Sequence, residues 1–313
     1  MSRVSMINHF QRLQTAVLFL AILMCQGGCG LFTRNTASKS KSEGRVARGI
    51  NAVLASARLP ARAKPSHDRI WKPNISVLPF AEIRSDQVHL HNIRDTHYRT
   101  EDDCDVRHFD QVVRLDDIQS LDFVVIPFKS TPSLAHTMIS FGLANGQHIV
   151  FSVEARLEQG ESYAPWEGSL NSYELIWIVA TERDSIGLRT TIRGDDVYLY
   201  RTRALPEQAR QVFLAATARV NEIERTPEFY DTLTNNCTTN IINMVNRLKP
   251  GTIQEDIRVL LPGHSDKLLY DQGLLVASGP FDQLKQASRI NLAANLNFGS
   301  PNFSQAIRGD VAP

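Results

Sequence analysis

Cys237 is the residue whose sequence surroundings most favour nucleophilic chemistry. It follows Thr234, Asn235 and Asn236, which are residue types that cap helices, so we expect it in the first turn of a helix. There the helix dipole and the free backbone N–H groups stabilise a thiolate, the reactive form of cysteine. The same N–H groups, flanked by Asn236 and Thr238, would bind the oxyanion that forms when the sulfur attacks a carbonyl group.

A thiol nucleophile needs a basic partner, and His136 is the candidate that we select. A histidine on a strand facing a cysteine at a helix start is the papain-type arrangement, here in the circularly permuted order because the histidine comes first. A strict two-residue turn at Asn145-Gly146 would point Glu154 to the other face, whereas one bulge residue would bring it opposite His136. We therefore name Glu154 as the residue that orients the imidazole, with Ser152 on the same side of the strand.

The other chemistry-bearing residues favour less specific interpretations. Cys104 lies in the acidic run 101–105, where nearby anions raise the pKa of a thiol and make it a poor nucleophile. A Cys104–Cys237 disulfide, or burial of Cys237 as a small apolar residue, are the alternatives to a catalytic thiol. His89 and His91 alternate on one strand face, but a second element would have to converge on them, so we expect solvated histidines, no metal and no cofactor.

The segments around these residues predict an α+β domain. Strands are expected near 77–79, 88–91, 123–128, 137–143, 149–153, 173–181 and 197–200. An Asn-Gly pair between the fourth and fifth of them is a strong hairpin signal. A helix should begin at Pro206, with an apolar stripe of Ala209, Val212, Phe213, Ala216 and Val220. The helix that opens near Cys237 should turn four apolar residues inward: Ile241, Ile242, Val245 and Leu248.

The amino-terminal residues have the pattern of a bacterial export signal. Arg3 and Arg12 precede an apolar run at 16–25, which is too short to span about 30 Å of hydrocarbon. The Gly-Gly-Cys sequence that ends at Cys29 resembles a lipobox, so we expect cleavage before Cys29 and attachment of a lipid to its thiol. A soluble exported protein cut near Gly28 is the alternative.

A basic segment follows this signal and precedes an acidic body. Residues 33–72 carry a net charge of +8 and residues 73–313 a net charge of −9, within a total of +1. That total argues against nucleic acid as a partner, and 42% hydrophobic residues exclude a disordered chain. Residues 44–59 fit either an amphipathic helix on anionic lipid or a solvated tether. We expect three regions: a signal peptide at 1–28, a lipid-anchored basic linker at 29–70 and a globular domain at 71–313.

Many short motifs resemble, in the expected order, the Lnb N-terminal periplasmic domain family. One of them is the run Thr-Asn-Asn-Cys-Thr-Thr at 234–239. Others lie at 92–95, 98–100, 136–141, 152–156, 173–175, 182–184, 188–190, 198–200 and 229–233. The resemblance covers residues 71–248. It implies a permuted papain-like fold, with an antiparallel sheet packed against helices and a site at Cys237 and His136.

For part of the family, the resemblance implies acylation of the amino terminus of lipoproteins with a phospholipid as donor. Cys237 would attack the phospholipid ester with His136 as base, giving a thioester and a lysophospholipid. The α-amine of a lipoprotein would then take the acyl chain. Four charged family positions either bind a headgroup or form buried structural pairs, and we favour the pairs. They are Arg156, Glu174, Glu182 and Arg189.

Two other functions stay open. A cell-wall amidase or peptidase would need an open polar cleft, whereas an acyltransferase would need an apolar tunnel beside Cys237. A non-catalytic envelope binding module would show a sulfur-to-imidazole distance too long for proton transfer. We expect a periplasmic lipoprotein of a Gram-negative outer membrane, with phospholipid and lipoprotein as partners. The acyltransferase members carry a membrane region after this domain, so this chain should reach lipid from its anchor and basic linker.

Overall fold

The computed structural model describes residues 64–164, 171–254 and 256–309. The expected signal peptide, Cys29 and most of the basic linker lie outside the described residues. The chain divides into units at 1–62 and 63–313, and everything below concerns the second unit. In the described residues, no helix combines the length and the apolar character that crossing a bilayer requires.

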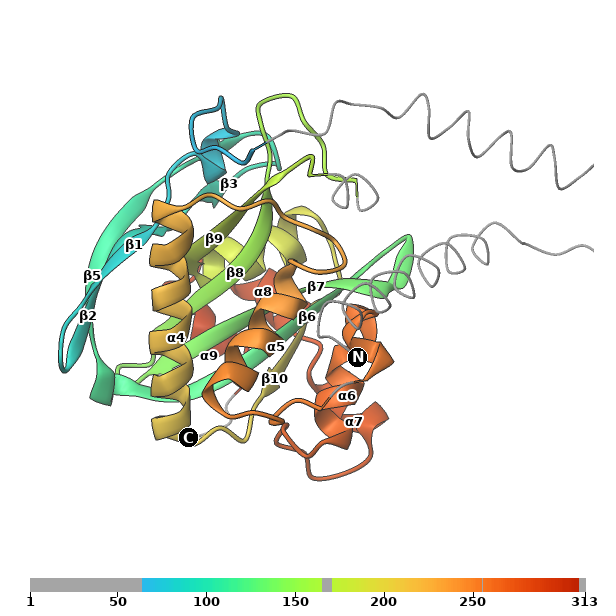
Figure 1. Cartoon of the computed structure of the whole chain (residues 1–313). Helices are drawn as coiled ribbons and strands as arrows, with labels where there is room; N and C mark the ends of the chain where they lie inside the picture. The colour runs from blue at the N-terminus through green and yellow to red at the C-terminus, as the bar shows by residue number, and fades with distance from the viewer. Residues whose placement is uncertain (1–63, 165–170, 255, 310–313) are drawn as a thin grey trace, which may run out of the picture. The chain divides into compact units, whose positions relative to one another are not determined.

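An eight-stranded mixed sheet is the centre of the domain (Figure 1). Its order is β1-β2-β9-β8-β7-β6-β10, and β5 pairs with β2 beside this path. The strands are β1 (Phe80–Ile83), β2 (Gln87–Arg94), β5 (His108–Arg114), β6 (Ile118–Phe128), β7 (Thr131–Leu143), β8 (His148–Arg156), β9 (Glu174–Thr181) and β10 (Tyr198–Arg201). A separate two-stranded sheet joins β3 (His97–Tyr98) to β4 (Cys104–Asp105).

The α+β class is confirmed, and two details of the expected sheet are wrong. The sheet is not wholly antiparallel, because β2 and β9 run parallel where Arg94 pairs with Ala180. The strand expected near 77–79 is not formed, and β1 begins at Phe80. The backbone carbonyls just before that segment accept hydrogen bonds from the Arg156 guanidinium instead of from a neighbouring strand.

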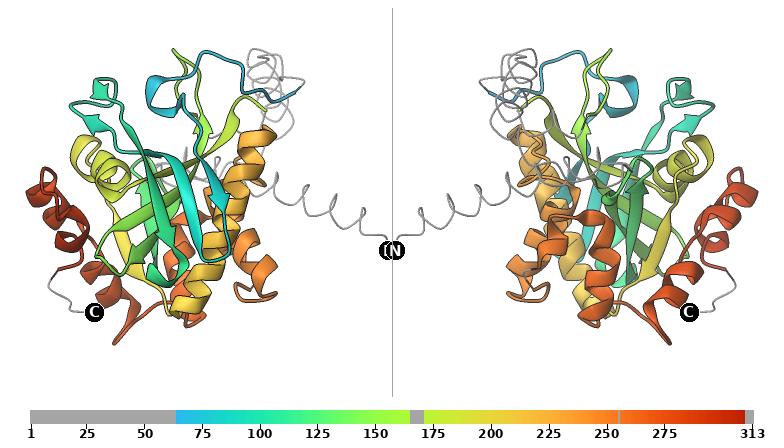
Figure 2. Two further views of the ribbon diagram at one scale, coloured as in Figure 1. Left: turned by 90° about the vertical axis from the view of Figure 1, so that its left-hand side faces the viewer. Right: turned by 90° about the vertical axis from the view of Figure 1, so that its right-hand side faces the viewer.

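Helices cover both faces of the sheet, as the two side views show (Figure 2). On one face, α4 (Pro206–Arg225) and α5 (Cys237–Leu248) pack on the larger apolar core. On the other, α3 (Glu182–Gly187), α8 (Asn291–Asn297) and α9 (Phe303–Ala306) pack on a smaller core that includes Met138. The remaining elements are η1 (Pro73–Ile75), η2 (Leu115–Asp117), η4 (Leu188–Ile192), η5 (Ile257–Val259), η6 (Pro262–His264), α6 (Ser265–Asp271) and α7 (Phe281–Ala287).

The helix expected at Pro206 is α4, and its predicted apolar stripe is buried. The Phe213 ring meets Phe141 of β7 and Phe151 of β8 edge to face, at centroid distances of 5.1 and 5.5 Å. Full burial of such a side chain stabilises the fold by about 2–3 kcal/mol. These contacts hold α4 across the two strands that carry the candidate site.

The β7–β8 hairpin closes through a three-residue loop at 144–146 rather than the predicted two-residue turn. The Leu143 N–H donates to the Gln147 carbonyl, and the last loop residue is a glycine with φ of 82°, which glycine adopts without strain. The extra residue shifts the register by one, so Met138 pairs with Ser152. Continued by two residues, this register sets Glu154 opposite His136, the arrangement that the bulged alternative predicted.

Candidate functional site

Cys237 is the first residue of α5, as its capping sequence predicts. The Asn236 side chain accepts a hydrogen bond from the Thr239 N–H, and the Thr239 hydroxyl accepts one from the Asn236 N–H, each at 2.9 Å. Asn236 also donates from Nδ2 to the Thr232 carbonyl at 2.7 Å. The N–H groups of Cys237 and Thr238 donate no hydrogen bond within the described residues, which leaves both able to bind an oxygen anion.

The Cys237 thiol lies against the central strand β7. Its Sγ is 3.9 Å from the Ala135 carbonyl oxygen and 3.9 Å from the Thr238 hydroxyl, and the residue is 4% exposed. The Thr238 hydroxyl is also bonded to that of Thr137 at 3.0 Å. Because Thr137 and Ala135 share one face of β7, this face carries the start of α5.

The surroundings of Cys104 raise the pKa of its thiol, the direction that the sequence predicts. Both described cysteines are free, so the alternative disulfide between Cys104 and Cys237 is not formed. Burial is the main cause that raises the Cys104 pKa, and the charges of Asp184 and Asp103 raise it further. The acidic run contributes less than expected because Arg99 forms an ion pair with Asp103.

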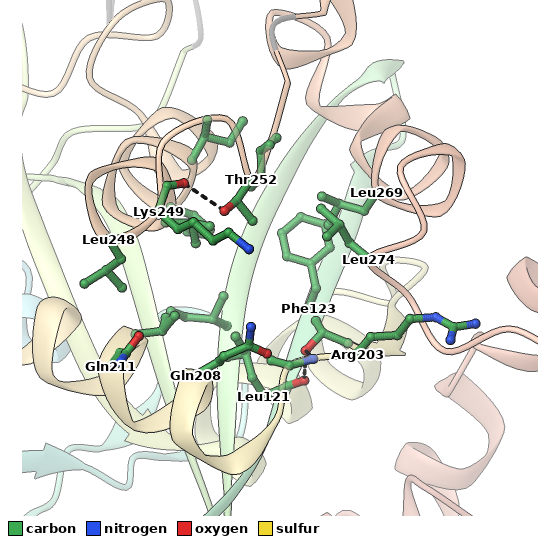
Figure 3. A pocket seen from close by; sticks show the side chains of 18 of the residues that line it. Leu121, Phe123, Arg203, Gln208, Gln211, Leu248, Lys249, Thr252, Leu269 and Leu274 are labelled. Carbon is green, nitrogen blue, oxygen red and sulfur yellow. Dashed lines mark hydrogen bonds between the residues drawn. The ribbon is translucent and has the colours of Figure 1, made fainter.

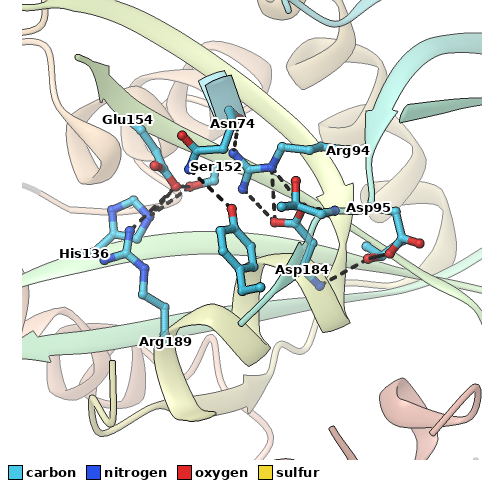
Figure 4. A network of polar contacts seen from close by, with 11 residues as sticks. Asn74, Arg94, Asp95, His136, Ser152, Glu154, Asp184 and Arg189 are labelled. Atoms are coloured by element: carbon cyan, nitrogen blue, oxygen red, sulfur yellow. Dashed lines mark hydrogen bonds and ion pairs between the residues drawn. The ribbon is translucent and has the colours of Figure 1, made fainter. Parts of the chain in front are cut away.

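His136 belongs to a polar cluster on the other face of the sheet (Figure 4). Its Nε2 lies 2.9 Å from Ser152 Oγ and 3.7 Å from Glu154 Oε1, and the Ser152 hydroxyl donates to the same carboxylate at 3.1 Å. Arg189, from η4, approaches Glu154 Oε1 at 3.7 Å. The structure thus brings together three of the predicted site residues: His136, Glu154 and Arg189.

Opposite charges within this cluster set its protonation state. Burial, followed by the charge of Arg189, lowers the pKa of His136 from 6.5 to about 3, against the opposing effect of Glu154. Burial alone would raise the pKa of Glu154, but Arg189 and His136 hold it at about 2. At neutral pH the cluster therefore contains a neutral imidazole beside an ionised carboxylate.

Among the described residues, no hydrogen bond joins Cys237 to His136, the two residues that the sequence predicts to act together. Successive side chains of a strand point to opposite faces. Ala135 faces α5 and the larger core, so His136 faces the smaller core, beside Ile126 of β6. The Cys237 and His136 side chains therefore lie on opposite faces of the sheet.

The two groups nevertheless lie near the same point of the sheet, where the pairing between β7 and β8 ends. Pairing between β7 and β8 ends at Met138 and Ser152, although β7 extends back to Thr131 and β8 onward to Arg156. The Cys237 sulfur lies against the β7 backbone just past this point. The His136 imidazole reaches from β7 to the Ser152 hydroxyl on β8.

An apolar cavity of about 480 Å³ lies along α5, on the Cys237 side of the sheet (Figure 3). Its walls include Thr238 in the first turn of the helix and Leu248 in the last. Sheet residues such as Phe123 form the opposite wall. This cavity corrects one expectation about α5. Of the four residues expected inward, Ile241 is buried, but Leu248 is 42% exposed because it borders the open cavity.

A comparison with models of known protein families finds a match. The family model of the Lnb N-terminal periplasmic domain matches residues 105–263, more than half of the chain. The chain belongs to this family. The matched part of this Lnb-type chain contains His136, Glu154 and Cys237, and membership in a family of periplasmic domains supports a place in the cell envelope. No curated protein and no solved structure matches the chain.

Of the four charged family positions named from the sequence, three make buried contacts with other parts of the domain. Arg156 is 2% exposed, donates to two backbone carbonyls before β1 and lies 4.2 Å above the Trp71 ring. Glu174 accepts from Arg69 at 2.7 Å, and Glu182 is fully buried. For Arg156, binding of a headgroup was the less favoured of the two alternatives, and its guanidinium is buried against these protein partners. Arg189 differs, because it lies beside the His136 cluster.

Sequence reasoning did not single out the buried ion pair between Arg94 and Asp184. The guanidinium donates to both carboxylate oxygens, the shortest distance being 2.7 Å, and the pair lies beside the His136 cluster (Figure 4). It ties β2 to α3, the helix that leads directly into η4 and Arg189. The sequence contained one indication of this pair: Arg94 and Asp184 each lie in a family motif, at 92–95 and 182–184.

Proposed function

We propose that this Lnb-type domain, with a permuted papain-like fold, is a cysteine-dependent acyltransferase that takes an acyl chain from a phospholipid. The observation that carries the proposal is the apolar cavity along α5, whose wall includes Thr238, the residue that follows Cys237. Its volume of about 480 Å³ is within the range of small-molecule sites. An acyl chain lying along α5 would bring its ester carbonyl to the amino end of the helix, where the thiol and two free N–H groups are located.

The first step would form a thioester. The Cys237 sulfur attacks the ester carbonyl as its proton passes to His136, and the N–H groups of Cys237 and Thr238 bind the oxyanion. The ester C–O bond then breaks, His136 returns the proton to the departing oxygen, and a lysophospholipid leaves. In the second step an amine attacks the thioester, His136 removes its proton, and the thiol is regenerated.

This mechanism requires the sulfur and the imidazole to meet at the point where the pairing of β7 with β8 ends. Catalytic hydrogen bonds are often absent from a free enzyme and form in the substrate complex. Nε2 of His136 is held by Ser152 and Glu154, while Nδ1 makes no hydrogen bond within the described residues. Nδ1 is therefore the atom that would exchange protons with Cys237, and Glu154 would orient the ring.

The acceptor that we propose is the amino terminus of a lipoprotein. A lipid on Cys29 and the basic linker at 29–70 would hold the domain at the outer membrane, where both substrates are embedded. The positive charge of the linker would bind anionic lipid and bring the cavity to the membrane surface. Neither a cofactor nor nucleic acid takes part.

Mass spectrometry of the full chain after incubation with phospholipid vesicles tests the proposal. We expect wild-type protein to gain the mass of one acyl chain on Cys237, released by hydroxylamine as a thioester should be. The Cys237→Ala variant should gain none, while Cys104→Ala should be acylated like wild type. Val245→Trp should fill the cavity and prevent acylation, because Val245 lines its wall.

Three results would overturn the proposal: no adduct on folded wild-type protein, an adduct that survives Cys237→Ala, or equal acylation of Val245→Trp. Cleavage of cell-wall peptides by a protein that forms no lipid adduct would establish the amidase alternative. The separation of Cys237 from His136 at rest is the observation that favours a non-catalytic module. Folded protein that forms no adduct and cleaves no peptide would support that alternative.

A further inference from the structure

Three metal-ligating side chains converge on the hairpin of β1 and β2, far along the sheet from the Cys237 site. His89 and His91 alternate on β2 and share one face, and Glu82 of β1 pairs directly with His89. One ligand atom from each lies within 4.8 Å of the other two. The sequence predicted solvated histidines because a second element had to converge on them, and β1 is that element.

His91 has the orientation of a metal-binding histidine. Its Nδ1 lies 2.8 Å from Asp110 Oδ2, so the tautomer that donates to this carboxylate carries its lone pair on Nε2. Nε2 faces Glu82 Oε1 at 3.4 Å, and it is buried without a hydrogen bond within the described residues. Phe80 stacks on the ring at 4.4 Å. A carboxylate that holds one imidazole nitrogen commonly orients the other toward a metal.

A β-bulge in β2 positions Asp110 for this contact. The pairing of β2 with β5 shifts between Leu90 and Ile93, and Asn92 within the bulge has a left-handed φ of 60°. The Asn92 N–H donates to Asp110 Oδ1 at 3.0 Å. One carboxylate oxygen is therefore fixed by the backbone while the other orients His91. Backbone strain of this kind is concentrated at functional sites.

We infer that Glu82, His89 and His91 form a binding site for a divalent transition-metal ion of the Zn²⁺ type. Two imidazoles and one carboxylate are a typical Zn²⁺ ligand set, whereas Ca²⁺ and Mg²⁺ prefer oxygen ligands alone. Arg84 donates to Glu82 Oε2 at 3.0 Å, which leaves Oε1 as the ligand atom. The fourth tetrahedral position is open to water. The ion would join the edge strand β1 to β2.

Titration calorimetry of the purified full chain with Zn²⁺ tests this inference. We expect one ion per chain in wild type, and no binding at this site in His89→Ala. Asp110→Asn should bind Zn²⁺ roughly 10–100-fold more weakly, as is typical when a ligating histidine loses its hydrogen-bond partner. His264→Ala is the matched control and should bind like wild type, because His264 is exposed on η6.

Thermal unfolding with and without Zn²⁺ gives a second measurement that needs no enzymatic activity. Zn²⁺ should raise the Tm of wild type and of His264→Ala but not that of His89→Ala. The His89 ring lies 4.0 Å from the His91 ring but bonds neither Asp110 nor Phe80. Its replacement therefore keeps the hydrogen bond from His91 to Asp110 and the stacking on Phe80, and should preserve the metal-free fold. The inference is overturned if wild type binds no Zn²⁺, or if His89→Ala binds it with unchanged affinity and the same rise in Tm.

Discussion

His136 is neutral in the folded chain at every pH above about 4, because burial and Arg189 lower its pKa to about 3. In the unfolded chain it titrates near 6.5, so below pH 6.5 only the unfolded state takes up its proton. The free energy of unfolding should then fall by about 1.4 kcal/mol for each pH unit between 6 and 4. Glu154, held at about 2, adds its own loss only below about 4.5.

Urea unfolding at pH 7 and pH 5 measures this effect. His136→Gln removes the titrating group, so wild type should lose about 2 kcal/mol more than the variant between the two pH values. His264→Gln, at an exposed position, should lose as much as wild type. Equal pH dependence in wild type and His136→Gln would show that His136 is not buried as a neutral imidazole.

The contrast between Cys237 and His136 shows what sequence can predict about single residues. The position of Cys237 follows from local capping residues, and it was predicted correctly. The direction of His136 depends on which face of β7 is covered by α5, a helix a hundred residues later in the chain. Nothing local to His136 contains that information, and a change of one residue in register reverses the face.

At the level of elements, the start of α5 depends on Asn236. Its side chain caps the Thr239 N–H and also donates to the Thr232 carbonyl. Asn236→Ala should lower the free energy of unfolding by about 1–2 kcal/mol, as is typical for loss of a cap. Asn236→Asp keeps the cap acceptor and loses only the second contact, so it should cost less. Urea unfolding of both variants measures the difference, and equal losses would contradict the capping role.

The two long helices show the limit of periodicity as a predictor. The stripe of α4 predicted a buried face, and that face is buried. The stripe of α5 has the same spacing, yet Val245 and Leu248 border a cavity. An apolar face packed against the core and one that lines an apolar cavity have the same sequence pattern. The sequence pattern alone therefore could not predict the cavity, and only the structure shows it.

On the scale of the whole molecule, residues after the family match complete the fold. The match ends at residue 263, but α8 and α9 close the smaller core beneath the sheet. Arg308 reaches Asp122 on β6 at 2.7 Å and Glu182 on α3 at 2.6 Å. These partners are 186 and 126 residues away, so no local pattern indicates the contacts.

Replacing Arg308 should destabilise the molecule strongly. Burial alone would raise the pKa of Glu182, and Arg308 holds it at about 2, so Glu182 is ionised. Glu182 and Asp122 are both buried beside this one guanidinium. Arg308→Met would leave Asp122 with Arg201 and with the His148 imidazole 3.8 Å away, and Glu182 with no arginine or lysine partner among the described residues. Breaking a buried pair in this way costs about 3–5 kcal/mol.

Urea unfolding of Arg308→Met, beside Arg289→Met as control, measures that cost. Arg289 pairs with Asp196 at the surface, where both side chains are about half exposed, so its loss should change stability by less than about 1 kcal/mol. A similar small change in Arg308→Met would mean that the carboxyl groups take up protons or water once the guanidinium is gone. The large difference expected between the variants follows from desolvation, because the two arginines make ion pairs of similar length and differ in exposure.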